Sequence, residues 1–158
     1  EISRLHCDEL LRTALVEQHK PVLAICVGLQ ALMSRSEENG GIDCLDILRG
    51  DVCHFGSPLY DADGRRLKVP HMGWNQVEQT MAHPLWRAIP DQTRFYFVHS
   101  YYVHAQDRSL LAGRLNYGVQ ADAALARDNL FAVQFHPEKS STAGLQLLRN
   151  FLEWNGQC

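Results

Sequence analysis

The stretch that decides the fold is LAICVGLQALM, residues 23–33, an apolar run interrupted by one cysteine, one glycine and one glutamine. Residues 22–25 follow Pro21 as a continuous aliphatic strand, which is typical of a buried parallel strand in an α/β sheet. Residues 28–33 suit a helix. Cys26 therefore falls at the switch from strand to helix, where a sharp turn lifts a side chain out of the sheet and suits a nucleophile.

Length and composition limit the classes of protein that the chain can belong to. It has 158 residues, 46% of them hydrophobic, so we expect one domain over residues 1–158 with its own core. The formal net charge is -3 and no block of Lys or Arg occurs, which argues against nucleic acid or an anionic membrane as the main partner. No apolar run reaches the roughly 18 residues of a membrane span and no signal sequence is evident, so we expect a cytoplasmic protein.

The cysteines and histidines do not form a pattern that binds a metal. Five cysteines, at positions 7, 26, 44, 53 and 158, are an odd number without a CxxC pair, which argues against a disulfide framework and a zinc site. The eight histidines form no HExxH motif and no pair with a cysteine at the spacing that metal ligands need. We therefore expect reduced thiols, no metal and no cofactor.

Beyond the nucleophile helix the pattern changes to short strands. SEENGG, residues 36–41, marks an exposed loop, so the helix ends near Ser34. A hairpin turn is expected at 127–129. The pattern predicts strands over residues 48–55, 67–79 with a break at Pro70, 94–104, 110–115, 121–126 and 130–135. It predicts helices over residues 5–20 and 142–154, the second with Leu145, Leu148, Phe151 and Leu152 on one face.

A second candidate for chemistry is His136-Pro137-Glu138. Proline stops the preceding strand, so His136 lies at a strand's carboxyl end, where sites gather in open α/β sheets. A thiol is nucleophilic as a thiolate, which a helix N-terminus and a nearby imidazole favour. The pattern thus predicts Cys26 as nucleophile, His136 as base and Glu138 as the group that orients the imidazole. A plainer interpretation stays open, because a cysteine in an apolar run is often a small buried hydrophobe and His-Pro-Glu is often only a turn.

With Cys26-Val27-Gly28-Leu29-Gln30 and His136-Pro137-Glu138 in place, the chain resembles the class I glutamine amidotransferases. Four further stretches are similar to the glutaminase subunits of imidazole glycerol phosphate synthases: SEENG at 36–40, VPHMGWNQV at 69–77, FYFVHSYYV at 95–103 and VQFHPEKSSTAGLQLLRNFL at 133–152. The resemblance covers nearly the whole chain. It implies a flavodoxin-like α/β fold, with a mostly parallel central sheet flanked by helices and additional antiparallel strands.

The resemblance also implies a reaction and a partner. The reaction is hydrolysis of L-glutamine through a thioester on Cys26, with ammonia passed to a (β/α)8-barrel cyclase subunit in histidine biosynthesis. The implied substrate-binding residues are Val27, Gly28, Gln30, Glu38, His99, Ser100 and Tyr101. Plainer interpretations stay open, with Gln30 as a solvated helix residue, Glu38 as a loop charge and residues 99–101 as an ordinary strand end.

The implied partner-facing residues are Pro70, Met72, Trp74 and Lys139. Trp74 also fits a core aromatic, but an aromatic and a methionine after a proline suit a protein interface. For Lys139 the plainer interpretation is a solvated lysine beside a glutamate.

One part of the family pattern is not in this sequence. The oxyanion hole of the family takes one backbone N–H from the residue after the nucleophile, here Val27, and another from a Pro-Gly-Val-Gly-type loop near the N-terminus. The chain opens on a helical pattern, whereas the first strand of a β-α-β sheet normally lies near its middle. We therefore expect the domain to lack its first strand and that loop.

Two rival interpretations stay open. The first is another amidotransferase of the same superfamily, such as that of guanylate, anthranilate or carbamoyl phosphate synthesis, or a γ-glutamyl hydrolase. The second is a non-catalytic fragment that keeps only the partner-binding face. PHMGWN argues against the first, and the presence of Cys26, His136 and Glu138 argues against the second.

Overall fold

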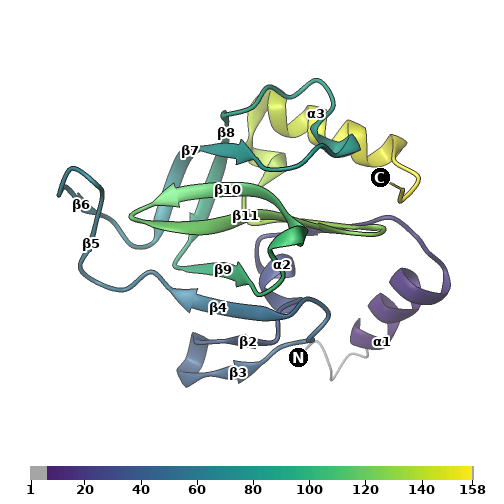
Figure 1. The fold of residues 1–158 in the computed structure, drawn as a ribbon, viewed down its shortest axis with the longest axis horizontal. Coiled ribbons are helices and arrows are strands. Elements are labelled where there is room, and N and C mark those ends of the chain that lie inside the picture. Colours follow the sequence, from purple (N-terminus) through teal and green to yellow (C-terminus); the bar gives the residue numbers. More distant parts are fainter. Residues whose placement is uncertain (1–6, 158) are drawn as a thin grey trace.

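The computed structural model describes residues 7–157, and one mixed sheet organises them (Figure 1). Within this range ten strands form that sheet, and β5 with β6 forms a separate hairpin. The strands are β1 Val22–Ile25, β2 Arg35–Ser36, β3 Ile42–Asp43, β4 Gly50–His54, β5 Leu59–Tyr60, β6 Arg66–Leu67, β7 His71–Gln79, β8 Thr93–His99, β9 Tyr101–Ala105, β10 Leu111–Tyr117, β11 Val119–Arg127 and β12 Leu130–Val133. The helices and turns are arranged around this sheet.

The helices are mostly short. The α-helices are α1 Cys7–Arg12, α2 Val27–Ala31 and α3 Ser141–Glu153, and α1 continues as a π-helical turn, η2 Thr13–Glu17. Single 3₁₀ turns are η3 Glu38–Gly40, η4 Pro84–Trp86, η5 Arg108–Leu110 and η6 Pro137–Lys139. No helix in residues 7–157 combines the length and the apolar character that a membrane crossing requires.

The strand β12 is buried on both of its faces. Phe131 and Val133 belong to the core cluster that includes Leu147 of α3. Leu130 and Ala132 belong to the cluster on the other face, which includes Leu29 of α2. Because side chains alternate along a strand, an apolar residue at every position covers both faces, and this explains the unbroken apolar run.

The α/β class expected from the sequence is confirmed, but the described sheet is mixed rather than mostly parallel. Among residues 7–157, only β1–β12 and β2–β4 are parallel pairs. The pairs β10–β11 and β11–β12 are antiparallel, joined by Gly118 and by the predicted turn at Asp128 and Asn129. Antiparallel strands close with short turns, whereas parallel neighbours need a crossover of a dozen or more residues, so these short connections dictate the pairing.

Two local expectations were wrong. SEENGG is not a plain exposed loop, because it contains the end of β2 and the turn η3, with Ser36 buried. The buried side of α3 is also turned from the predicted face, since Leu145 and Leu152 are 62% and 84% exposed while Gly144 and Leu147 are buried. The predicted start of the first helix, at residues 5 and 6, lies outside the described residues.

A close backbone contact sets that rotation of α3. A Cβ atom added to Gly144 would lie 1.9 Å from the carbonyl oxygen of Pro137 in η6. The side chain of Ser140, between the two elements, donates to the carbonyl of His136 at 2.6 Å and accepts from the N–H of Tyr96 at 2.9 Å. The turn that carries His136 is therefore held between α3 and β8.

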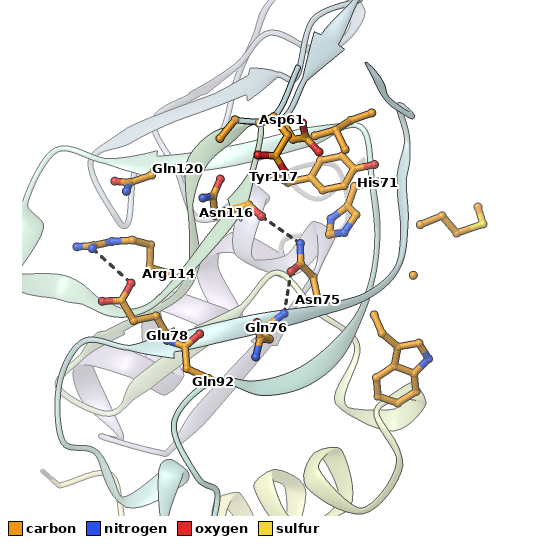
Figure 2. A pocket seen from close by; sticks show the side chains of 17 residues that line it. Asp61, His71, Asn75, Gln76, Glu78, Gln92, Arg114, Asn116, Tyr117 and Gln120 are labelled. Atoms are coloured by element: carbon orange, nitrogen blue, oxygen red, sulfur yellow. Dashed lines mark hydrogen bonds and ion pairs between the residues drawn. The ribbon is translucent and has the colours of Figure 1, made fainter. Parts of the chain in front are cut away.

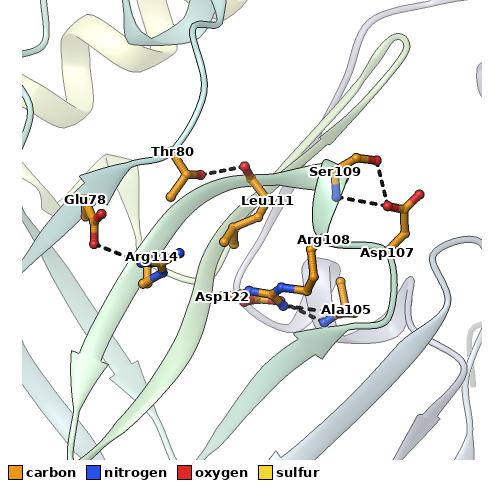
Figure 3. Close-up of polar contacts among 9 residues, drawn as sticks. All are labelled: Glu78, Thr80, Ala105, Asp107, Arg108, Ser109, Leu111, Arg114 and Asp122. Carbon is orange, nitrogen blue, oxygen red and sulfur yellow. Dashed lines mark hydrogen bonds and ion pairs between the residues drawn. The ribbon is translucent and has the colours of Figure 1, made fainter.

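An ion pair with a buried carboxylate fastens β11 to the end of β9 (Figure 3). Asp122 is 1% exposed, and its two oxygens each accept from Arg108 at 2.8 Å. One of them also accepts from the N–H of Ala105 at 2.7 Å. The carboxylate is thus satisfied despite its burial, as a buried charge has to be.

A second buried polar pair joins β7 to β8, where His71 and His99 are opposite residues in the strand register. Nδ1 of His99 lies 2.7 Å from the carbonyl oxygen of Tyr101, which only accepts, so His99 donates from Nδ1. Its Nε2 then accepts from Nδ1 of His71 at 3.0 Å. The His71 ring also stacks on Tyr117, with centroids 3.8 Å apart. Burial lowers the pKa of His71 to about 3 and that of His99 to about 4, so both rings are neutral.

The substitution Gly144→Ala tests the contact between α3 and η6. We expect it to lower the unfolding free energy by about 1–3 kcal/mol, because the new methyl group meets backbone and not a side chain that can move away. The measurement is urea unfolding. The matched control is Gly28→Ala in α2, where the added Cβ would lie 3.5 Å from the nearest atom, an ordinary contact. Equal stability of the two variants would contradict the close-contact assignment.

The histidine pair predicts acid sensitivity. The folded pKa values lie below the ordinary 6.5, so as the pH falls the unfolded chain binds protons first, and stability present above about pH 6.5 is lost toward pH 4. His71→Phe keeps a stacked ring and removes one titrating group. Between pH 7 and pH 5 its unfolding free energy should fall by about 2 kcal/mol less than that of the natural chain, as measured by urea unfolding at both pH values. Equal losses would mean that His71 is not held neutral by the fold.

Candidate active site

Three segments meet at one edge of the sheet. Because β1 and β12 are parallel neighbours, their carboxyl ends lie together, and the N–H of Cys26 donates to the carbonyl of Val133 at 2.8 Å. Gln134 and His136 follow β12 directly. The corner between β8 and β9, residues 98–101, forms the third segment. The edge therefore collects the residues that the sequence singled out.

Cys26 has a strained backbone, with φ 51° and ψ -108°. As predicted, β1 ends at Ile25. The helix α2 begins at Val27, one residue before its predicted start, so Cys26 alone makes the switch between the two elements. A non-glycine residue at such angles costs on the order of 1–3 kcal/mol, which the surrounding structure has to offset. A strain of this kind is typical of a nucleophile held on a sharp turn.

The sulfur of Cys26 contacts a main-chain carbonyl and a side-chain amide. Its Sγ lies 3.9 Å from the carbonyl oxygen of Val98 and 3.7 Å from Nε2 of Gln134. Burial raises the pKa of the Cys26 thiol, while hydrogen bonds from the N–H of Val27 and from Gln134 act in the opposite direction. The thiol is therefore protonated at neutral pH and donates to Val98.

The imidazole of His136 is oriented by Glu138. Nδ1 lies 2.7 Å from Oε1 of Glu138, and since a carboxylate only accepts, Nδ1 carries the proton. Nε2 is then the basic nitrogen, and it is buried with no hydrogen-bond partner among residues 7–157. This is the tautomer that a general base requires. The structure does not pair His136 with Cys26, whose S–H contacts Val98 instead.

A pocket of about 330 Å³ opens beside the thiol. Its lining residues are Cys26, Val27, Gln30, Glu38, Pro70, Val98, His99, Ser100 and Tyr101. Eight of these nine are residues that the sequence analysis had singled out, the exception being Val98. Gly28 does not line the pocket but lies within α2, against Ala24. His136 and Glu138 lie outside the lining as well.

Sequence reasoning missed Gln134, which contacts the sulfur directly. The available signal was a polar residue at the end of an apolar strand, directly before Phe135 and His136. In the described part of the chain, no three His, Cys, Asp or Glu side chains gather as a metal site requires.

The residues assigned to a partner lie on the surface beside this pocket. Met72 and Trp74 on β7 are 63% and 46% exposed, and Pro70 and Lys139 are exposed too. Trp74 makes an edge-on contact with Tyr96, with ring centroids 5.9 Å apart. The interpretation of Trp74 as a core aromatic was therefore wrong.

A larger pocket, of about 800 Å³, is lined in part by residues of β7 (Figure 2). Figure 2 shows its polar walls, with Asn75 donating to the carbonyl of Asn116 and Arg114 paired with Glu78. It contains His71 and Trp74 but not Cys26, so the candidate nucleophile lies in the smaller pocket.

Comparison with known sequences identifies the family of the chain. The family described as Glutamine amidotransferase class-I matches residues 3–154. The chain is similar to imidazole glycerol phosphate synthase subunit HisH 1 of Pseudomonas aeruginosa, with 58% identity over 157 residues, covering 99% of this chain and 72% of that protein. It is also similar to subunit HisH of Acinetobacter baylyi, with 58% identity over 149 residues, covering 94% of this chain and 69% of that one.

Solved structures share the fold. A glutamine amidotransferase matches 96% of this chain and 69% of its own chain, with a TM-score of 0.64 and 17% identity. A glutamine amidotransferase of Thermotoga maritima matches with a TM-score of 0.58 and 17% identity, and this chain spans 53% of its length. The family match over residues 3–154, together with 58% identity to HisH subunits, shows that the chain belongs to the class I glutamine amidotransferases, in the family of imidazole glycerol phosphate synthase subunit HisH.

Proposed function

We propose that the chain acts as the glutaminase subunit of an imidazole glycerol phosphate synthase. It hydrolyses L-glutamine to glutamate and ammonia and passes the ammonia to a (β/α)8-barrel cyclase subunit in histidine biosynthesis. Family membership supports the reaction, and the relatives named as synthase subunits support the partner. The observation that carries the proposal is the pocket in which Cys26 lies with Gln30, Glu38 and Tyr101. A cytoplasmic location fits a mechanism that needs a reduced thiol.

The proposed reaction begins with loss of the thiol proton. Nε2 of His136 takes the proton of Cys26, and the thiolate attacks the side-chain amide carbon of glutamine. The tetrahedral intermediate collapses as His136 gives the proton to the leaving nitrogen, which departs as ammonia. A water that His136 deprotonates then cleaves the thioester, which releases glutamate and restores the thiol. Glu138 holds the imidazole in the required tautomer throughout.

The pocket walls supply recognition of the substrate in this proposal. The carboxylate of Glu38 lines the pocket and provides an anionic partner for the α-ammonium group of glutamine. Gln30 and residues 99–101 line the remaining walls. The N–H of Val27 donates toward the sulfur of Cys26 and is the proposed partner of the oxyanion.

The resting geometry supports low activity of the subunit alone. The S–H of Cys26 donates to Val98, its pKa is raised by burial, and Nε2 of His136 has no partner among the described residues. Before attack, the thiol has to leave Val98 and meet the imidazole. Because Met72, Trp74 and Lys139 are exposed beside the pocket, we propose that the cyclase subunit binds there and favours the competent arrangement.

Replacement of the thiol tests the mechanism. In the complete synthase, Cys26→Ala should lower glutamine-dependent turnover by roughly a thousandfold or more, because no other group in the pocket can form the thioester. Turnover with added ammonia should be unchanged, since the cyclase does not need the thiol. Steady-state assays with each nitrogen source measure both quantities.

The matched control is Cys44→Ala, at a half-buried cysteine outside the pocket, which should leave both activities unchanged. Glutaminase activity that survives in Cys26→Ala would exclude the thioester route. Absence of any glutaminase activity in the natural chain with its cyclase would favour the non-catalytic interpretation.

Removal of Trp74 tests the partner face. Trp74→Ala should weaken cyclase binding about 30-fold, the cost typical of a tryptophan at the centre of an interface. Its melting temperature should stay close to that of the natural chain, because the side chain is half exposed. Titration calorimetry and thermal melting on one preparation provide both values.

The matched control for the partner face is Leu152→Ala, an exposed apolar side chain on α3 that should affect neither quantity. Normal cyclase affinity of Trp74→Ala would place the interface elsewhere.

A further inference from the structure

Gln134 is a buried amide with both ends engaged at the active site. Its side chain is 1% exposed, and its backbone N–H donates to the carbonyl of Ala123 at 2.8 Å, which fixes its position next to β12. Oε1 accepts from Nε2 of Gln30 at 3.1 Å, and Nε2 lies 3.7 Å from Sγ of Cys26. Nothing in the reaction described above uses this side chain.

The direction of these hydrogen bonds follows from one group that can only accept. Nε2 of Gln30 lies 3.1 Å from the carbonyl oxygen of Tyr101, so the NH₂ end of Gln30 has to face that oxygen. The second hydrogen of the same NH₂ group then points at Gln134, which has to present its oxygen. The NH₂ end of Gln134 is left to face the sulfur. A reversed Gln134 would set its oxygen against the sulfur and its NH₂ against that of Gln30.

We propose that Gln134 donates the hydrogen bond that favours the thiolate form of Cys26, and that Gln30 fixes the amide in the donating orientation. This inference rests on the proposed function, because it assigns a role at the nucleophile of that reaction. When the thiol loses its proton, the contact with the carbonyl of Val98 becomes repulsive, whereas the N–H of Gln134 meets a full negative charge. A hydrogen bond to an ionised acceptor is roughly twice as strong as a neutral one, so the bond strengthens as the nucleophile forms.

The charged and titratable groups around the sulfur are few. Glu138 opposes the thiolate and Lys139 favours it, and both lie at the exposed rim in η6. On the β8–β9 side the pocket contains Tyr101 and His99, and burial keeps His99 neutral with its pKa at about 4. Glu38 comes from η3, and His136, the base of the proposed reaction, directly precedes η6. Gln134 is thus a buried donor that does not titrate, unlike the rim charges, which water also screens.

The test measures how readily Cys26 ionises. Iodoacetamide reacts with the thiolate, so the alkylation rate of Cys26 against pH, followed by mass spectrometry of the peptide that contains it, reports the ionised fraction. Gln134→Met keeps the length of the side chain and removes the donor. Gln134→Glu keeps the shape and replaces the donor with an acceptor. We expect alkylation at pH 7 to be about tenfold slower in Gln134→Met and slower still in Gln134→Glu, with rates that approach the natural value at high pH.

The control variant is Asn150→Leu, which removes another buried amide, one that donates to the carbonyls of Leu85 and Arg87. It should lower thermal stability without moving the alkylation profile. In the complete synthase, Gln134→Met should lower kcat for glutamine about tenfold and leave KM within about twofold, since it acts on the nucleophile and not on substrate recognition.

Each outcome decides the proposal. An unchanged alkylation profile in both Gln134 variants overturns it, as does slowing by one factor at every pH, which indicates blocked access and not altered ionisation. If Gln134→Met does not fold, Gln134→Glu and Gln30→Leu give the same decision, because Gln30→Leu releases the orientation of Gln134 and should slow alkylation at pH 7. The alkylation profile needs no turnover, so it stands even if Cys26→Ala retains glutaminase activity and the proposed function fails.

Discussion

The parallel pairing of β1 with β12 is the constraint on which the rest of the structure depends. Four consecutive register pairs, from Val22 with Leu130 to Ile25 with Val133, bring the two strands to one edge together. The bond from the N–H of Cys26 to Val133 extends the ladder by one step, just where the chain turns sharply into α2. The strain at Cys26 is tolerated because the pairing on one side and the helix on the other leave the residue no relaxed alternative.

Order at the active site comes from a single acceptor at a strand end. The carbonyl of Tyr101 accepts from His99 and from Gln30, and because it cannot donate, it decides the tautomer of one and the orientation of the other. His99 in turn accepts from His71. Gln30 in turn donates to Gln134, whose NH₂ end then faces the sulfur. A strand end that looks like ordinary packing therefore sets the donor and acceptor directions of a network that extends from β7 to the sulfur of Cys26.

The sequence predicted those structural features whose physical cause lies within a few neighbouring residues. The aliphatic run before Cys26 predicts the strand, and the proline after His136 predicts the strand end, because burial and ring geometry act within a few residues. Most of the pocket lining was available from the family resemblance. Gln134 was not, since its role depends on a partner 108 positions away, and no local pattern contains that distance.

The direction in which α3 faces was hidden for a similar reason. Its apolar residues are distributed widely enough to suit more than one face, and the contact of Gly144 with Pro137 selects the face that is buried. The predicted proportion of parallel strand pairs was too high, because a strand-like pattern does not show whether the strand runs parallel or antiparallel to its neighbours. Direction depends on the lengths of the connections, such as the single residue Gly118 between β10 and β11.

The protonated state of Cys26 also bears on oxidative damage. Hydrogen peroxide attacks thiolates and scarcely attacks thiols, and a sulfenic acid formed from a nucleophile blocks turnover until a reductant restores it. In the resting geometry burial keeps the proton on the sulfur and Val98 accepts it. A protonated Cys26 is therefore a poor target for peroxide. Under the proposed mechanism it becomes sensitive only when it loses its proton for attack on the substrate.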